Sequence, residues 1–348
     1  MITAELIDLA TQRRSPARVV AARSVQGGRR MNNRDDPPDQ SCRLELRPPE
    51  ARVVPGETSC AAYKERIELV DERRTVTTKT DEPKYRRWLD VAPPSDYLRN
   101  IANSATGKGY KAFAKSLLQI EEGSVVVDLG CGAGVDLPAY ARAAGHTGTV
   151  IGIDNDEALL AHAEKSATRW PTVSVTQADI HQLPLNAESV DRIHIDRVLQ
   201  HVESPPAVLA EAARTLRTDG MIVCVEPDWA TLVFDHPDVA FSDTYTQHVV
   251  AQVIRNATMG RALPRLLDDA GLSVETIYPV TAHWTDAIEA DKVLGFRDVC
   301  KHAVTDGHLP AARTQGWIDD LMTGPFFCSL SLFIVSARSK SRSKSNTI

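Results

Sequence analysis

Short apolar runs alternate with helical patterns between residues 125 and 225, and this alternation restricts the possible folds more than any other feature. The short runs are rich in β-branched residues, while the stretches between them carry apolar residues at helical spacing. Strands are expected over residues 125–129, 149–153, 173–175, 190–195 and 221–225. Repeated strand–helix–strand units predict an α/β fold with a mostly parallel, Rossmann-like sheet covered by helices on both faces. Such a sheet binds its ligands at the carboxyl ends of its strands.

Polar caps mark the ends of two of the intervening helices. Asn155 or Asp156 can cap a helix over 157–168, and Ser204 with two following prolines can begin a helix over 205–217. A further helix is expected over 135–144. Beyond residue 225, the pattern predicts helices over 245–257 and 263–270, strands over 273–278 and 326–335, and a mostly helical insertion over 286–322.

The segment VVVDLGCGAG at residues 125–134 joins a strand to a helix through a glycine-rich turn. Glycines let the backbone approach a ligand closely, and the helix start offers free N–H groups. Nicotinamide-binding proteins carry GxGxxG here, but this turn reads GxGxG, with Val135 at the third glycine position. The carboxylate of Asp128 would repel a pyrophosphate and suits a ligand with an ammonium group. S-adenosylmethionine has an ammonium, a carboxylate and a sulfonium, but no phosphate.

With this turn, the chain resembles the class I S-adenosylmethionine-dependent methyltransferases over about residues 110–335. Three further segments carry the resemblance: IGIDNDEALL with Asp154, ADIHQLPL with Asp179, and SVDRIHIDRVLQHV after the fourth strand. The last resembles the small-molecule branch, which includes quinone-pathway methyltransferases. The resemblance implies a seven-stranded sheet with an antiparallel last strand, and S-adenosylmethionine as cofactor. It implies cofactor contacts from Asp128, Gly130, Cys131, Gly132, Gly134, Asp154, Asn155, Asp179, Ile180 and Arg197.

Two families of nucleic-acid methyltransferases carry signatures that this chain lacks. No Asn/Asp-Pro-Pro-aromatic tetrad follows the fourth strand, where residues 194–197 read HIDR, and the sequence contains no Pro-Cys pair. The formal charge is +3 over residues 1–90 and +4 over residues 337–348, which leaves −13 for residues 91–336. Because nucleic-acid binding needs a dense cationic surface, we expect no nucleic-acid partner. A protein substrate is harder to exclude.

Three side chains near the ends of the fourth and fifth strands are candidates for a general base. His201 lies in VLQHV, and Glu226 and Asp228 lie in VEPDW. Each has a second interpretation: His201 as a structural histidine at a helix edge, and the two acids as groups that order a turn. With Trp229, the acids would also suit a cationic amine. A base is needed only if the acceptor arrives protonated.

Aromatic residues are scarce at 5%, yet several lie where they could line an apolar acceptor pocket. Any one of them can instead belong to the core. Among the aromatic residues near the final strand, Phe327 is the one that we expect in the core. The expected pocket residues are Tyr97, Tyr110, Trp229, His283, Trp284, Trp317 and Phe326.

The domain organisation follows from composition. Residues 11–34 hold seven arginines and no acid, and prolines follow, so residues 1–60 are expected to be a disordered leader, as a transit peptide or an upstream extension. We expect a partly helical extension over 61–96, the methyltransferase domain over 97–337 with the 286–322 insertion covering the pocket, and a disordered basic tail over 338–348.

The six cysteines form no CxxC pair and no zinc-site spacing, so no metal is expected. Several lie in apolar segments, which favours a reducing, cytoplasmic compartment. No apolar run approaches the ~20 residues of a membrane helix. We therefore expect a cytoplasmic monomer or homodimer that methylates an O, N or C nucleophile of a small molecule in specialised metabolism. The alternatives are a protein or RNA methyltransferase, and a cyclase or regulatory protein that binds S-adenosylmethionine without methylating.

Overall fold

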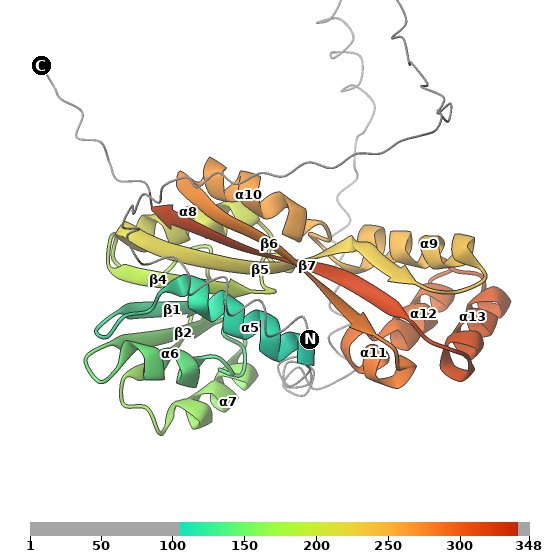
Figure 1. Cartoon of the computed structure of the whole chain (residues 1–348), viewed down its shortest axis with the longest axis horizontal. Coiled ribbons are helices and arrows are strands. Elements are labelled where there is room, and N and C mark those ends of the chain that lie inside the picture. The colour runs from blue at the N-terminus through green and yellow to red at the C-terminus, as the bar shows by residue number, and fades with distance from the viewer. Residues whose placement is uncertain (1–104, 340–348) are drawn as a thin grey trace, which may run out of the picture. The chain divides into compact units, whose positions relative to one another are not determined.

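The structure, a computed structural model, describes residues 105–339, which form a seven-stranded sheet with helices on both faces (Figure 1). The strand order is β3-β2-β1-β4-β5-β7-β6, and β7 is antiparallel to both of its neighbours. This confirms the predicted fold class. The strands are β1 (Val125–Leu129), β2 (Thr149–Asp154), β3 (Val173–Gln177), β4 (Val190–Asp196), β5 (Leu216–Phe234), β6 (Leu272–Trp284) and β7 (Cys328–Ser339).

The helices divide between the two faces because neighbouring strand residues point to opposite sides. Val126 joins a core beneath α5, α6 and α7, whereas Val127 joins a core beneath α8 and α10. The helices are α5 (Ala105–Leu118), α6 (Leu137–Ala144), α7 (Glu157–Ala167), α8 (Pro205–Thr215), α9 (Val239–His248), the π-helix η1 (Val249–Val253), α10 (Met259–Asp269), α11 (Ala287–Leu294), α12 (Phe296–Thr305) and α13 (Ala311–Thr323).

The predicted caps begin α7 and α8. The side chain of Asp156, rather than Asn155, accepts a hydrogen bond from the Leu159 amide, and Ser204 accepts one from the Ala207 amide. The helix expected over 245–257 is instead the end of α9 followed by the wider turn of η1.

β5 is much longer than the 221–225 expected. The parallel pairing with β4 ends at Asp196 and Val225, but β5 continues to Phe234 because β7 supplies an antiparallel partner. β6 and β7 stay paired as far as Trp284 and Cys328. Three strands therefore run on past the carboxyl ends of the parallel strands (Figure 1).

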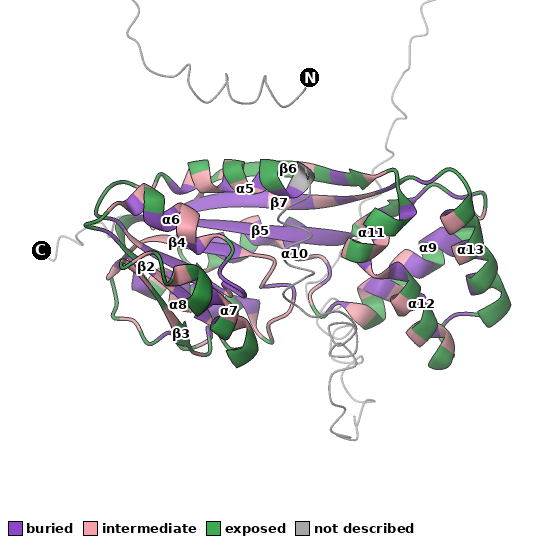
Figure 2. Cartoon of the chain, turned by 90° about the horizontal axis from the view of Figure 1, so that it is seen from below, coloured by how far each residue is buried: buried purple, intermediate pink, exposed green. Residues whose placement is uncertain are grey.

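A second core surrounds this extension. The extended parts of β5, β6 and β7, together with α9, η1, α11, α12 and α13, are called the outer lobe. Its centre is Phe234, whose ring contacts those of Tyr245, Phe296, Trp317 and Phe326 at centroid distances of 5.1–6.3 Å. Figure 2 shows that β5 and β7 are buried both beside the parallel strands and within the outer lobe. The insertion expected over 286–322 corresponds to α11–α13.

Several boundaries differ from expectation. β7 continues to Ser339, past the expected domain end at residue 337, because Arg338 and Ser339 still have backbone partners, Ser273 and Leu272, on β6. Phe327 is 42% exposed, so its assignment to the core was wrong; Phe326 is the buried one of the pair.

The expected leader, the 61–96 extension and the tail beyond Ser339 lie outside the described residues. Within 105–339, no helix has both the length and the apolar character needed to cross a bilayer.

Candidate functional site

The glycine-rich turn after β1 is bonded to the end of β2. The Gly130 amide donates to the Ile153 carbonyl at 2.7 Å, and the Gly132 amide donates to the Asp154 carboxylate at 2.8 Å. Gly130 has φ +71°, and a Cβ there would lie 2.4 Å from a methyl carbon of Val198. Only glycine fits this close approach. The turn is thus fixed to β2 on one side and packed against the segment after β4 on the other.

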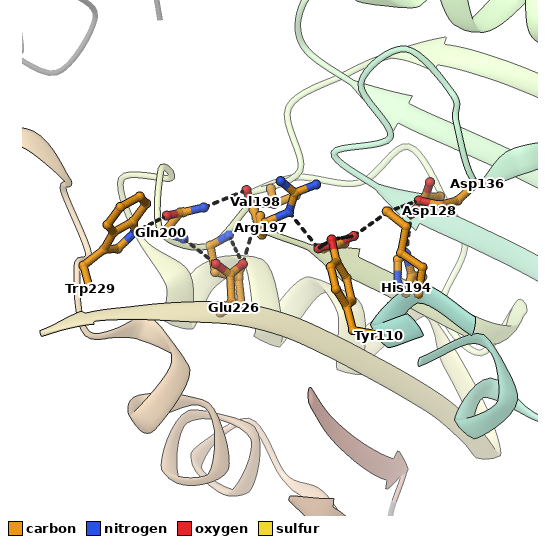
Figure 3. A network of polar contacts seen from close by, with 12 residues as sticks. Tyr110, Asp128, Asp136, His194, Arg197, Val198, Gln200, Glu226 and Trp229 are labelled. Carbon is orange, nitrogen blue, oxygen red and sulfur yellow. Dashed lines mark hydrogen bonds and ion pairs between the residues drawn. The ribbon is translucent and has the colours of Figure 1, made fainter. Parts of the chain in front are cut away.

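Asp128 lies under this turn rather than beside it. Its side chain is buried and accepts a hydrogen bond of 2.8 Å from the Nδ1 atom of His194, its register partner on β4 (Figure 3). Burial opposes protonation of His194, but the hydrogen bond to Asp128 and the negative charges of Asp128, Asp196 and Asp136 together outweigh it and raise the pKa of His194. One oxygen of Asp128 is therefore bonded to a side chain of the protein itself, and its contact with a ligand ammonium stays a prediction.

A cluster of charges joins α5 to the carboxyl end of β4. The Lys111 ammonium lies 2.5 Å from Asp136 and 2.6 Å from Asp196, and the Tyr110 hydroxyl donates to Asp196 at 3.1 Å. Arg197 donates to the same carboxylate. Burial would raise the pKa of Asp196, but Lys111 and Arg197 outweigh it and hold the pKa well below its usual value. Asp196 is therefore ionised at neutral pH.

Two of the three candidate bases are taken up by other groups. Glu226 is fully buried, and its carboxyl group accepts from the amides of Val198, Leu199 and Gln200. Asp228 is buried and receives both Nε and Nη2 of Arg261. Both carboxyl groups are thus engaged by protein groups, burial raises the pKa of Glu226 to about 8, and their role as a general base stays a prediction.

His201 is the third candidate, and its ring is partly buried. Burial, with a smaller effect from Arg197, lowers the pKa of His201 to about 4. The imidazole is neutral at pH 7 and could accept a proton. Its low pKa means that it holds a proton only weakly, so His201 is a weak base.

Known proteins are similar to this chain over the same region. A family described as a methyltransferase domain matches residues 120–271. A 37.1 kDa protein in transposon TN4556 of Streptomyces fradiae, itself uncharacterised, is 42% identical over 254 residues, which cover 72% of this chain and 74% of the relative. Demethylmenaquinone methyltransferase of Staphylococcus aureus is 28% identical over 151 residues, 43% of this chain and 63% of that enzyme.

The chain belongs to the class I S-adenosylmethionine-dependent methyltransferases. Among solved structures, a SAM-dependent methyltransferase from Aquifex aeolicus aligns with a TM-score of 0.44 and 16% identity, over 70% of this chain and 98% of that one. S-adenosylmethionine is therefore the cofactor of this chain.

The residues at the turn fit that cofactor. The Asp154 carboxylate, at the end of β2, accepts from the Gly132 amide at 2.8 Å and from the Asp156 amide at 3.0 Å, and its contact with the ribose stays a prediction. A Cβ on Gly130 would overlap Val198, and one on Gly134 would lie 2.9 Å from Ala163, so both glycines let the turn pack closely against the neighbouring segments. The Cys131 amide is bonded to the Ile153 carbonyl.

The remaining expected cofactor residues of this methyltransferase lie near the carboxyl ends of the strands. Asn155 is exposed after β2, with its carbonyl bonded to Gln177 on β3. Asp179 is mostly exposed after β3 and accepts from the amide and ring of His181. Ile180 packs in the core beneath α8 and α10.

Most of the expected aromatic pocket residues lie in the interior. Trp317 and Phe326 belong to the outer core, and Trp317 donates to Ser242. Trp229 is also buried, while Tyr110 is bonded to Asp196 as described. Assignment of these side chains to an open pocket is therefore not supported. His283 is exposed and stacked on Phe327, Trp284 is partly buried between two cores, and Tyr97 lies outside the described residues.

Sequence reasoning missed Lys111, Asp136 and His194. The signal for His194 was available: it stands two residues before Asp196, so both lie on one face of β4 beside the turn. Lys111 and Asp136 carry no such signal, because α5 meets the start of α6 only through the tertiary fold.

Proposed function

We propose that this methyltransferase transfers the methyl group of S-adenosylmethionine to an O, N or C nucleophile of a small organic molecule, in specialised metabolism. The observation that carries the proposal is the position of α5. Tyr110 and Lys111 bond this helix to Asp196 at the end of β4 and to Asp136 at the start of α6. Because α5 packs on one face of the sheet and its first turns are bonded to the carboxyl end of β4, it flanks this end of the strands, which favours a small acceptor over a polymer.

Two further observations support a small acceptor. Residues 91–336 carry a net charge of −13, which disfavours a phosphate backbone. An enzyme named for its action on demethylmenaquinone is among the relatives. The chain spans 63% of that enzyme, so the acceptor itself is not carried over.

We assign the cofactor contacts by position. Asp154 would hold the ribose hydroxyls, Asp179 and the Ile180 amide would meet the adenine, and the turn at Gly130–Gly134 would lie against the amino-acid end. Bound there, the cofactor supplies a methyl group already activated by its sulfonium. The protein then contributes mainly in-line placement, which can supply several kcal/mol of the barrier. We further propose that the outer lobe, through α11–α13, covers the acceptor.

Methyl transfer from a sulfonium needs a general base only if the acceptor must lose a proton. His201 is neutral and weakly basic, and Glu226 and Asp228 are occupied, so the proposal favours an acceptor that is nucleophilic without strong deprotonation. The free, buried cysteines of the described residues, Cys131, Cys224, Cys300 and Cys328, support a reducing, cytoplasmic compartment.

The test is incubation of the purified protein with methyl-labelled S-adenosylmethionine and three separate acceptor pools. These pools are a small-molecule extract, total RNA and total protein, and Asp154→Ala is the matched control. We expect label in the small-molecule pool, with adenosylhomocysteine released in equal amount. Label confined to RNA or protein would contradict the proposal. Product without adenosylhomocysteine would indicate a cyclase, and cofactor binding without any product would indicate a regulatory protein.

A further inference from the structure

Residues 197–202, which we call the post-β4 segment, are held by side chains that come from later in the chain. Glu226, on β5, accepts from three consecutive amides of the segment: Val198 at 2.8 Å, Leu199 at 2.6 Å and Gln200 at 3.3 Å. Glu226 has no exposed surface. Three amides that would otherwise be buried without a partner are thus satisfied by one carboxyl group.

Asn256, in the loop before α10, satisfies the carbonyls of the same segment. Its Nδ2 atom donates to Leu199 at 2.9 Å and to Val202 at 2.8 Å, and its own amide donates to the Gln200 carbonyl at 3.0 Å. Glu226 and Asn256 therefore hold the segment through its donors and its acceptors, respectively.

The outer core adds one more connection. Trp229, a member of that core, donates from Nε1 to the Gln200 side chain at 2.7 Å, and Gln200 donates in turn to the Arg197 carbonyl (Figure 3). Arg197 has φ +59°, a left-handed conformation that a non-glycine residue adopts only when its surroundings hold it there. Its amide is bonded to the Val225 carbonyl at 2.7 Å.

The segment in turn forms one side of the cofactor turn. The side chain of Val198 occupies the place where a Cβ of Gly130 would be, at 2.4 Å. A shift of the segment would therefore change the space available at the glycine-rich turn, and it would move Arg197 and His201 together.

We propose that Glu226 and Asn256 are positioning residues of the methyl-transfer site, which fix the post-β4 segment against the cofactor turn and connect it to the outer lobe. This inference rests on the proposed function only in that the outer lobe meets the acceptor. Neither residue needs to touch the cofactor or the acceptor, because both act through the backbone of residues 197–202.

The experiment compares Glu226→Gln and Asn256→Asp with wild type by amide hydrogen exchange and by calorimetry with adenosylhomocysteine. Glu226→Gln places an amide N–H against a backbone N–H, and Asn256→Asp places a carboxylate against two carbonyls. We expect exchange across residues 198–200 to rise by roughly tenfold or more while β1 stays protected. Affinity for adenosylhomocysteine should fall by about tenfold, because the released segment would occupy its binding-competent position only about a tenth of the time.

Leu321→Ala on α13 is the matched control, because it opens a cavity in the outer core and lowers thermal stability. A purely structural role predicts that this control weakens adenosylhomocysteine binding as much as the two test variants do, and that result would overturn the proposal. Unchanged exchange across 198–200, or faster exchange with unchanged affinity, would also overturn it. If Asn256→Asp does not fold, it is replaced by Asn256→Ser, which keeps one shorter hydrogen-bond donor. The expected loss of adenosylhomocysteine affinity is then smaller. None of these readouts uses an acceptor, so label found in RNA or protein would refute the proposed function alone.

Discussion

The two loops that meet at Gly130 and Val198 are held in different ways. The glycine-rich turn is held by backbone amides and by Asp154, all within the β1–β2 unit. The post-β4 segment is held by the side chains of Glu226, Asn256 and Trp229, which belong to β5 and the chain beyond it. The first loop is thus defined by a short continuous motif, whereas the second depends on three side chains from later in the chain. Substitutions of these side chains can release the second loop while the hydrogen bonds of the first stay intact.

The contact between the two loops is tested most strongly by Gly130→Ala. The new Cβ would be strained at φ +71° and would overlap Val198 at 2.4 Å, so we expect the free energy of unfolding to fall by about 4 kcal/mol. Urea denaturation measures this loss. Adding Val198→Ala removes the overlap and should recover about 2 kcal/mol. Wild-type stability of the single variant would show that the loops do not touch.

Asp154→Ala tests the glycine-turn side alone. Loss of two charge-assisted hydrogen bonds to the ribose should weaken adenosylhomocysteine binding by about 3 kcal/mol, or roughly a hundredfold. Isothermal titration calorimetry measures the affinity. Hydrogen exchange across residues 198–200 should stay at the wild-type rate, since the post-β4 segment keeps its own partners. Equal binding by variant and wild type would remove the ribose assignment.

Lys111→Met tests the charge cluster on the other side of the post-β4 segment. It leaves the carboxylates of Asp136 and Asp196 without their shared cation, and the side chain of Asp196 is only 6% exposed. Removing one partner from a largely buried pair should lower the free energy of unfolding by about 2–3 kcal/mol. Thermal denaturation measures the change. Adding Asp136→Asn should restore part of the loss; no restoration would contradict the shared role of Lys111.

The response to acid should distinguish the two loops, because only the post-β4 segment contains a histidine. The pKa of His201 is about 4 in the folded protein and 6.5 in the unfolded chain, so between these values the unfolded state binds more protons. Stability is complete above pH 6.5 and decreases as the pH falls toward 4, by about 2 kcal/mol for this residue. Urea denaturation at pH 7 and pH 4.5 should show a smaller decrease for His201→Gln. Equal decreases in both proteins would refute this assignment.

Sequence reasoning located the parts of the fold that depend on local pattern. β1 has its predicted bounds, Ser204 caps α8 as expected, and the turn at Gly130 follows the predicted strand. These features depend on neighbouring residues, whose periodicity and capping chemistry are visible in one short window.

What the sequence did not reveal depends on distant partners. β5 reaches Phe234 because β7 pairs with it, and the pairing begins only at residue 328. Phe326 packs in the outer core and Phe327 is exposed, because the path of the chain just before β7, which the sequence does not show, turns only the first of them inward. Glu226 was recognised as important, but its role as a backbone acceptor required knowing that residues 198–200 lie beside it.

The register of β6 with β7 has a consequence for how this protein can diversify. Trp284 and Cys328 are paired, so the chain leaves the sheet and returns to it at adjacent points, and residues 285–327 form a closed excursion that carries α11, α12 and α13. Such a stretch can be replaced as a cassette by recombination or design while both of its attachment points stay in place. Because Phe234 and Tyr245 pack against this stretch, an exchange of the piece would have to keep the apolar side chains that face them.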